Sequence, residues 1–175
     1  MSDADRFRAL VLPHLDAAWG FARWLARDPV EAQDLAQEAM LRAWRYFEGF
    51  RGEAAKPWLL RIVRNTWVDR RSERVKAGEP LDAATEVASA APDPEAAAGQ
   101  GERRRVVAAA LASLPAEMRE VLVLREIQDL SYKQIAQALN LPIGTVMSRL
   151  SRAREKLAEV LRLRLGRSEH GLPDL

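Results

Sequence analysis

Hydrophobic and polar positions repeat with the period of an α-helix along most of this chain. Apolar residues return every three or four positions, and the strict alternation that indicates β-strands is absent. The pattern therefore predicts an all-α protein with several short and medium helices. The helical patterns fall within residues 7–25, 29–47, 56–73, 106–114, 117–127, 131–139 and 143–165.

Capping residues and prolines mark where helices begin in the first part of the chain. Asp28 precedes Pro29, and an aspartate in this position caps free backbone N–H groups while proline fits the first turn. Glu31 is expected to complete a capping box with Asp28. Pro57 opens the next helix in the same way. Pro13 is expected to kink or divide the helical pattern in which it lies.

Residues 131–157, SYKQIAQALNLPIGTVMSRLSRAREKL, are typical of two helices joined by a tight turn. Ser131 and Gln134 form a predicted capping box at the first helix. Asn140 occupies the turn, because asparagine tolerates the left-handed backbone conformation better than most residues. Pro142 prepares the start of the second helix. This helix-turn-helix pattern predicts a second helix that enters the DNA major groove, and an ordinary helical hairpin with a basic face is the alternative.

The region from residue 76 to 103 lacks helical periodicity and is rich in alanine, proline, glycine and acidic residues. This composition predicts a flexible linker. A flexible chain of this length averages roughly 30 Å from end to end and extends to about 90 Å. We therefore expect a first domain at residues 1–75, a second domain at 104–166 and a disordered tail at 167–175.

Composition narrows the class of protein further. The 175 residues include no cysteine, which excludes disulfides and cysteine-based zinc sites and suits a reducing cytosol. No apolar run is long enough to span a membrane and no signal-peptide core is present, so we expect a cytoplasmic protein. The net charge is only +2, and any DNA affinity must come from cations placed locally. We expect no metal and no cofactor.

Two groups of side chains in the first part of the chain are candidates for binding. Acidic and amide residues gather on helix 29–47. The alternative interpretation of this cluster is an ordinary solvated surface without a binding role. Arginines on helix 56–73 lie near several aromatic residues. Cations beside exposed rings suit single-stranded nucleic acid, because bases stack on the rings for roughly 1–3 kcal/mol each. The aromatics could instead be core, which we favour for Trp44, Phe47 and Trp58 and leave open for Phe50.

Three segments resemble the bacterial RNA polymerase sigma factors of the extracytoplasmic-function (ECF) type, within the sigma-70 family. The segment DPVEAQDLAQEAMLRAWRYF is similar to the polymerase-binding region of that family, and KPWLLRIVRNTWVDRR is similar to its −10 promoter-reading helix. The segment LPAEMREVLVLREIQDLSYKQIAQALNLPIGTVMSRLSRAREKL is similar to its whole −35 domain. The resemblance covers nearly all the chain except the linker and tail. It implies a sigma factor that recognises −35 and −10 elements and promotes strand opening for transcription initiation.

The resemblance also implies roles for particular residues. Asp34, Gln37 and Glu38 match the family positions that dock on the β′ coiled coil of the polymerase core. Met147 stands where family members often carry a basic residue, which bears on the preferred −35 sequence. The residues expected to contact DNA lie in a loop that captures a flipped base (Phe50, Arg51), on the −10 helix (Arg61, Arg64, Asn65) and on the −35 recognition helix (Thr145, Ser148, Arg149, Arg152).

The resemblance implies three partners: the polymerase core, promoter DNA and an anti-sigma factor. The core is expected to bind through its β′ coiled coil and its β flap. The resemblance implies neither membrane insertion nor catalysis. Two other functions fit parts of the sequence. A repressor or activator could use the same helix-turn-helix, with the first domain for dimerisation or sensing, and would bind an operator alone. An α-helical enzyme could use the closely spaced carboxylates Glu31, Asp34 and Glu38, but no helical histidine or nucleophile motif accompanies them.

Overall fold

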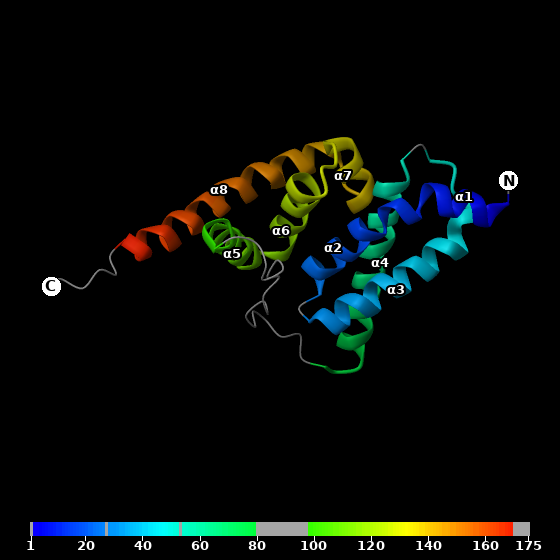
Figure 1. Cartoon of the computed structure of the whole chain (residues 1–175), viewed down its shortest axis with the longest axis horizontal. Coiled ribbons are helices and arrows are strands. Elements are labelled where there is room, and N and C mark those ends of the chain that lie inside the picture. Colours follow the sequence, from blue (N-terminus) through cyan, green and yellow to red (C-terminus); the bar gives the residue numbers. More distant parts are fainter. Residues whose placement is uncertain (1, 27, 53, 80–97, 170–175) are drawn as a thin grey trace.

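The structure, a computed structural model, describes residues 2–26, 28–52, 54–79 and 98–169. Within these ranges every regular element is a helix, which confirms the all-α prediction (Figure 1). The elements are α1 (Asp3–Leu10), η1 (Leu12–His14), α2 (Leu15–Leu25), α3 (Pro29–Tyr46), η2 (Phe47–Gly49), α4 (Ala55–Lys76), α5 (Ala98–Ala112), α6 (Ala116–Leu122), η3 (Val123–Ile127), α7 (Tyr132–Leu139) and α8 (Ile143–Glu169).

Helices α1 to α4 form the first half of the molecule, in which α2, α3 and α4 pack against one another. Pro13 lies in the short helix η1 and separates α1 from α2, as predicted. The Asp28 carboxylate accepts hydrogen bonds from the backbone N–H groups of Val30 and Glu31, which confirms it as the cap of α3. The predicted capping box is wrong, because the Glu31 carboxylate lies 2.6 Å from the guanidinium of Arg74 on α4. That ion pair joins the two longest helices of this half.

Helices α5 to α8 form the second half and contain the predicted helix-turn-helix. The Ser131 hydroxyl accepts a hydrogen bond from the backbone N–H of Gln134, and the Gln134 side chain accepts one from the Ser131 N–H. Asn140 ends α7 in the left-handed conformation, with φ 52° and ψ 51°. Both predictions are confirmed, and the turn sets α8 across α7. The buried side chains that hold α7 and α8 in place are Ile135, Ala138, Leu139, Val146, Leu150 and Ala153.

The chain between α6 and α7 is shaped to reach the first half. After the π-helical turn η3, Asp129 adopts φ 55°, and Leu130 follows with only 2% of its surface exposed. Gln128 is also buried, and its backbone oxygen accepts a hydrogen bond from the Lys56 ammonium at the start of α4. The bend thereby directs one apolar side chain and one carbonyl oxygen toward the first half.

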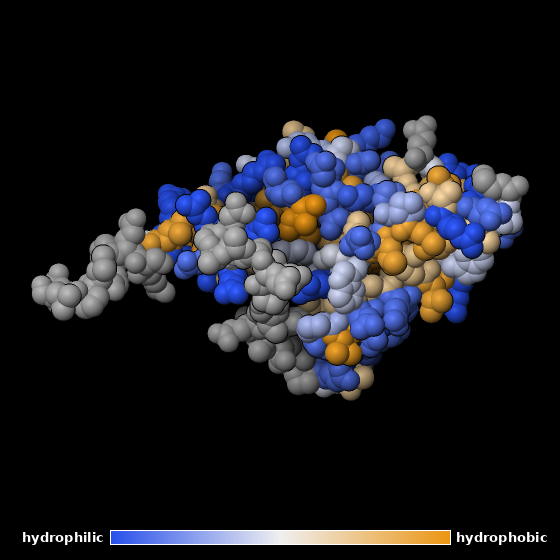
Figure 2. All heavy atoms as spheres, in the orientation of Figure 1, coloured by the Kyte–Doolittle hydropathy of each residue, from blue (hydrophilic) through white to orange (hydrophobic). Residues whose placement is uncertain are grey.

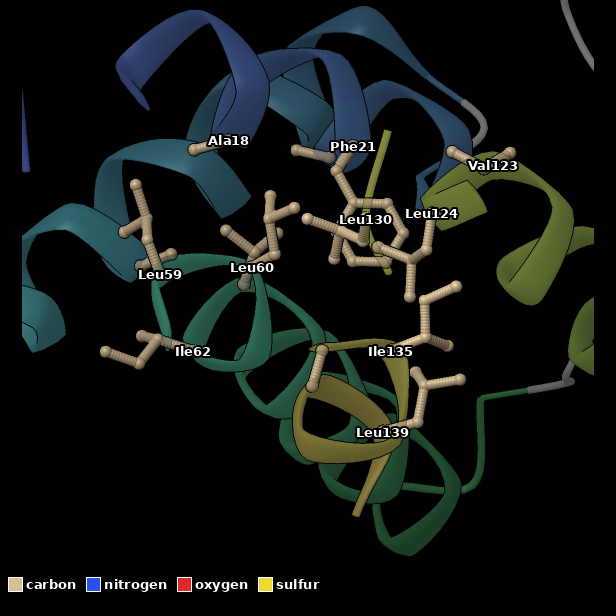
Figure 3. Close-up of a cluster of buried hydrophobic side chains, with 14 of the residues drawn as sticks. Ala18, Phe21, Leu59, Leu60, Ile62, Val123, Leu124, Leu130, Ile135 and Leu139 are labelled. Carbon is tan, nitrogen blue, oxygen red and sulfur yellow. The ribbon is translucent and has the colours of Figure 1, made fainter. Parts of the chain in front are cut away.

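The two halves pack together and share one hydrophobic core, which the sequence pattern did not predict. Figure 3 shows Phe21 and Leu60 of the first half pointing into the same cluster as Leu124, Leu130 and Ile135 of the second. Helix α7, the first helix of the helix-turn-helix, lies against α4. The contact between the halves is therefore apolar at its centre, and it includes the helix predicted to read DNA in the first half.

The helix ends differ from the expected domain boundaries. Helix α4 continues to Lys76, and α5 begins at Ala98, before the expected start of the second domain at residue 104. Helix α8 continues to Glu169, into the segment expected to be a tail. Most of the expected linker, residues 80–97, lies outside the described residues, as do residues 170–175.

Candidate nucleic-acid and polymerase interface

One face of α3 is turned to solvent along most of the helix. Asp34 and Gln37 lie on it and are exposed. Leu41, 60% exposed, and Trp44, 48% exposed, continue the same face, because residues three or four apart are neighbours on a helix. The core interpretation of Trp44 is therefore wrong, although one side of its ring meets Phe7 edge-on with the ring centroids 5.1 Å apart. Asp34 and Gln37, the residues predicted to dock on the polymerase, thus lead into an exposed apolar strip.

Glu38, the third predicted docking residue, is bound within the protein. Its two carboxylate oxygens accept hydrogen bonds of 2.7 Å from Arg42 and from Arg70. Arg42 also donates to Asp69 at 2.6 Å, and Arg70 donates to the backbone oxygen of Asp34 at 3.1 Å. Burial alone would raise the pKa of Glu38, but the bonds from the two arginines outweigh it and the pKa is lowered. This network ties α3 to α4.

The predicted −10 residues on α4 are divided between solvent and the second half. Arg61 and Asn65 lie one turn apart and are both exposed. Arg64 instead faces α6, where its Nε lies 2.9 Å from a carboxylate oxygen of Glu120, whose side chain is 10% exposed. Burial raises the pKa of Glu120, although the charge and hydrogen bond of Arg64 act in the opposite direction. Two of the three residues are thus open to a ligand, and the third is paired across the halves.

The predicted base-capturing loop holds a buried ring. Phe50 is 5% exposed, stacks on Phe47 with centroids 5.8 Å apart and lies 4.7 Å from the centroid of Trp58. Of the two interpretations left open for Phe50, the structure favours the core. Arg51 beside it is exposed, and its guanidinium donates to the backbone oxygens of Glu48 and Phe50. In this arrangement Arg51 is the part of the loop that a nucleic acid can reach.

The start of α8 presents the predicted −35 residues on two sides. Ser148 and Arg152 are exposed, and Thr145 before them is partly exposed. The Ser148 hydroxyl donates to the backbone oxygen of Thr145 at 3.0 Å. Arg149 faces α6: its side chain is only 19% exposed, and its guanidinium lies 3.6 Å from the Glu117 carboxylate. The structure therefore brings three of the four residues to one outer surface and places Arg149 behind it.

The two candidate surfaces differ in chemistry. Figure 2 shows hydrophilic side chains over most of α8, whereas hydrophobic side chains gather over the first half around α1 and α3. Near the start of α8 the exposed apolar side chains are Ile143, 50% exposed, and Met147, 52% exposed. The α3 face thus suits a protein partner that buries apolar area, and the α8 surface suits a polyanion with a few apolar contacts.

Comparison with known proteins assigns both halves. Residues 10–76 match the family described as sigma-70 region 2, and residues 104–157 match sigma-70, region 4. The chain is 36% identical over 169 residues to RNA polymerase sigma-H factor of Pseudomonas aeruginosa, which covers 91% of this chain and 88% of that protein. It is 31% identical over 170 residues to the ECF RNA polymerase sigma factor SigW of Bacillus subtilis, which covers 91% of each. The chain belongs to the ECF sigma factors of the sigma-70 family.

Two solved structures have the same fold. This sigma factor matches RpoE, solved in complex with the anti-sigma factor NepR from Bartonella quintana, with a TM-score of 0.75 and 28% identity over 93% of this chain and 98% of that one. It also matches CnrH, solved in complex with the cytosolic domain of CnrY, with a TM-score of 0.61 and 26% identity over 91% and 87% of the two chains. As a member of this family, it binds RNA polymerase and recognises promoters.

Two other features are absent from the part of the sigma factor that the structure describes. Within it, no group of three or more histidine, aspartate or glutamate side chains is placed to hold a metal ion. No helix among the described residues combines the length and apolar character needed to cross a bilayer.

Sequence reasoning missed two features of the sigma factor's surfaces. The apolar strip of Leu41 and Trp44 could have been found, because both residues follow Gln37 at helical spacing. The pairing of Arg64 with Glu120 carried no signal, since 56 positions separate the two residues and they belong to different halves.

Proposed function

We propose that this sigma factor docks on the polymerase core with the outer face of α3, reads the −35 element with α8 and reads the opened −10 strand with α4. The observation that carries the proposal is the geometry of the helix-turn-helix. Its turn at Asn140 leaves the start of α8 exposed with Ser148 and Arg152 at the surface. That arrangement lets the N-terminal residues of the second helix reach base edges in a major groove.

For the −35 element, three kinds of contact are available on α8. Arg152 can pair with a phosphate or with a guanine edge, and a bidentate guanine contact discriminates by about 1–3 kcal/mol. The Ser148 hydroxyl suits either base edges or phosphates. The exposed Met147 offers apolar contact of the kind that suits a thymine methyl group, in a position where family members often carry a basic residue. The half that carries α8 also contacts the β flap of the polymerase.

For the −10 element, α4 supplies a cation and an amide. Arg61 is placed to meet phosphates, and the Asn65 amide can read the edge of an unpaired base. Extracting a base from the duplex costs a few kcal/mol, and stacking and hydrogen bonding in the loop beside Arg51 offset that cost. The sequence contains no phosphate-binding loop of the G-x-x-x-x-G-K type, so strand opening is driven by binding rather than by nucleotide hydrolysis.

For polymerase docking, the α3 face offers polar side chains that fix the orientation of the partner and apolar side chains that the partner can bury. The Asp34 carboxylate and Gln37 amide pair with cations and amides on the β′ coiled coil, contacts that fix orientation more than affinity. Leu41 and Trp44 add apolar surface, and an exposed tryptophan is a frequent centre of binding energy. Glu38 holds α3 on α4 instead of contacting the partner.

In this proposal the chain is not itself an enzyme and works in the cytoplasm. An anti-sigma factor binds it and holds it inactive, and the complex of RpoE with the anti-sigma factor NepR supports this part of the proposal. The −35 and −10 elements lie about two DNA turns apart, roughly 70 Å at ~34 Å per turn. The expected linker must therefore be partly extended, and a polymerase channel that holds it accounts for this.

Run-off transcription with purified core polymerase tests the proposal. The chain should co-purify with core and direct initiation from a promoter with both elements, whereas core alone should not initiate there. A chain that does not bind core polymerase and binds an operator by itself would be a repressor or activator, and this result would refute the proposal.

A further inference from the structure

We infer that the crevice between α2, α4 and α6 is a binding site for a purine nucleotide. The crevice has a volume of about 260 Å³, and it lies beside the ion pair of Arg64 with Glu120. The proposed function uses neither of the two tryptophans that line it. The inference therefore stands apart from promoter recognition and polymerase docking, and it can be tested on the sigma factor alone.

Two tryptophan rings form much of the crevice wall. Trp24 comes from the end of α2 and Trp67 from α4, and each is partly buried with one side against the core. Neither ring contacts another aromatic ring within the described part of the chain, whereas the rings around Phe47 pack on one another. Bases stack on aromatic side chains of this kind, because every base has a planar π-face. The crevice thus offers faces on which a planar ring system can stack.

Arg71 supplies a cation beside these rings. Its guanidinium carbon lies 5.7 Å from the centroid of the Trp67 ring, one helical turn away on α4. No carboxylate among the residues that the structure places forms an ion pair with Arg71. A guanidinium matches the geometry of a phosphate with two parallel N–H bonds. A stacked base and a phosphate can therefore be held side by side.

The remaining charges favour an anionic ligand over a cationic one. The charged side chains that line the crevice are Arg64, Arg71, Arg119, Glu117 and Glu120. Both glutamates already meet an arginine: Glu120 lies 2.9 Å from Arg64, and Glu117 lies 3.6 Å from Arg149. Burial also raises the pKa of Glu120, which weakens its negative charge. A cationic ligand would have to displace an arginine, whereas an anionic ligand meets Arg71 directly.

Glu120 and the size of the crevice narrow the ligand to a purine nucleotide. One carboxylate oxygen of Glu120 accepts from Arg64, and a carboxylate has a second oxygen that can accept an N–H from the edge of a base. Two indole walls suit the larger area of a purine. The volume lies just below the range of about 300–1,000 Å³ that is typical of ligand pockets. It suits one nucleotide and is small for a dinucleotide.

Isothermal titration calorimetry on the full, free chain tests the site, with AMP and GMP as probes. At the binding efficiency of drug-sized ligands, a Kd of about 10–100 μM is expected. Adenosine lacks the phosphate, and ribose 5-phosphate lacks the base. Each should bind about tenfold or more weakly than AMP, because each uses only one of the two parts of the site.

Substitutions separate the two parts. Arg71→Gln should weaken AMP about fivefold or more and leave adenosine unchanged, since it removes only the phosphate contact. Arg45→Gln is the matched control, because it removes the same charge from an exposed position outside the crevice. Trp67→Leu should weaken AMP and adenosine equally, by about fivefold or more, whereas Trp67→Phe keeps a stacking face and should weaken both less.

Nuclear magnetic resonance locates the ligand independently of affinity. The indole N–H signals of Trp24 and Trp67 should shift as AMP is added. Those of Trp44 and Trp58 should not, because these rings contact Phe7 and Phe47 outside the crevice.

Three results would overturn the inference. The first is no heat of binding and no indole shift with about 1 mM AMP or GMP. The second is ribose 5-phosphate binding as tightly as AMP, since the site would then hold an anion without a base. The third is AMP affinity that Arg71→Gln and Trp67→Leu leave unchanged. If Trp67→Leu loses helix content by circular dichroism, the ratio of AMP to adenosine affinity in Arg71→Gln decides the test.

Discussion

Replacing Glu38 by alanine is expected to destabilise this sigma factor while leaving the proposed docking face of α3 intact. The substitution removes two hydrogen bonds of 2.7 Å, one from Arg42 and one from Arg70. Arg42 keeps its bond to Asp69, so the link between α3 and α4 is weakened and not abolished. The three charged side chains are 24–34% exposed, and solvent screens the pairs in part.

The size of the loss follows from this geometry. A solvent-exposed ion pair contributes about 0.2–1 kcal/mol, and a charge-assisted hydrogen bond in a drier place contributes about 1.5–3 kcal/mol. For two partly screened bonds at Glu38, a total of about 1–2 kcal/mol is expected. Because the halves share one core, the chain should unfold as a unit. A loss of 1 kcal/mol then lowers Tm by about 2–4 °C, so Glu38→Ala should melt about 2–8 °C below the unmodified chain.

Thermal melts followed by circular dichroism measure this change, and competition for core polymerase at a temperature where both chains are folded measures docking. Asp34→Ala is the matched variant on the same helix: it should keep the melting temperature and lower affinity for core about five- to tenfold, or about 1–1.4 kcal/mol. The reasoning would be refuted if Glu38→Ala melted like the unmodified chain and lost core affinity as Asp34→Ala does. Glu38 would then be a direct polymerase contact.

Other substitutions test the remaining assignments. The pKa of Glu38 is lowered in the folded chain, so its contribution to stability is present above about pH 4.5 and is lost as the pH falls through the native pKa. Glu38→Gln should therefore make the free energy of unfolding, measured with urea, fall less steeply as the solution is acidified. Asn140→Ala should lower the free energy of unfolding by about 1–2 kcal/mol, because alanine is strained at φ 52°, whereas Asn140→Gly should be close to neutral. Arg152→Ala should weaken holoenzyme binding to promoter DNA and reduce the salt dependence by about one unit of slope in a filter-binding assay, and an unchanged slope would exclude a phosphate contact. Asn65→Ala should leave core binding intact and impair run-off transcription, and equal transcription would remove Asn65 from the −10 site.

The local features of this fold could be predicted because the residues that cause them are neighbours in sequence. The Ser131 capping box, the left-handed Asn140 and the Asp28 cap each depend on residues a few positions apart. Each therefore leaves a signature in a short stretch. The class of the fold and the positions of the helices followed from the same short-range patterns.

Contacts between distant residues could not be predicted in the same way. Periodicity shows that a helix has an apolar face but does not say which helix covers it, so the packing of α7 on α4 was not foreseen. The partner of Glu38 on α4 lies 32 positions away, and a carboxylate on a helix surface has the same pattern whether it is solvated or paired. Trp44 and Phe50 reversed the expected order, since the helical tryptophan is half exposed and the loop phenylalanine is buried.

The shared core has a consequence for synthesis of the chain. The first half leaves the ribosome before α6 and α7 exist, and its side chains Phe21 and Leu60 then lack the second-half residues that cover them. At ~5–20 residues per second, the intervening segment takes several seconds to be translated. The nascent first half is thus the state of this polypeptide in which aggregation is most favoured. It is also the state in which binding of chaperones at the exit tunnel would protect the chain most.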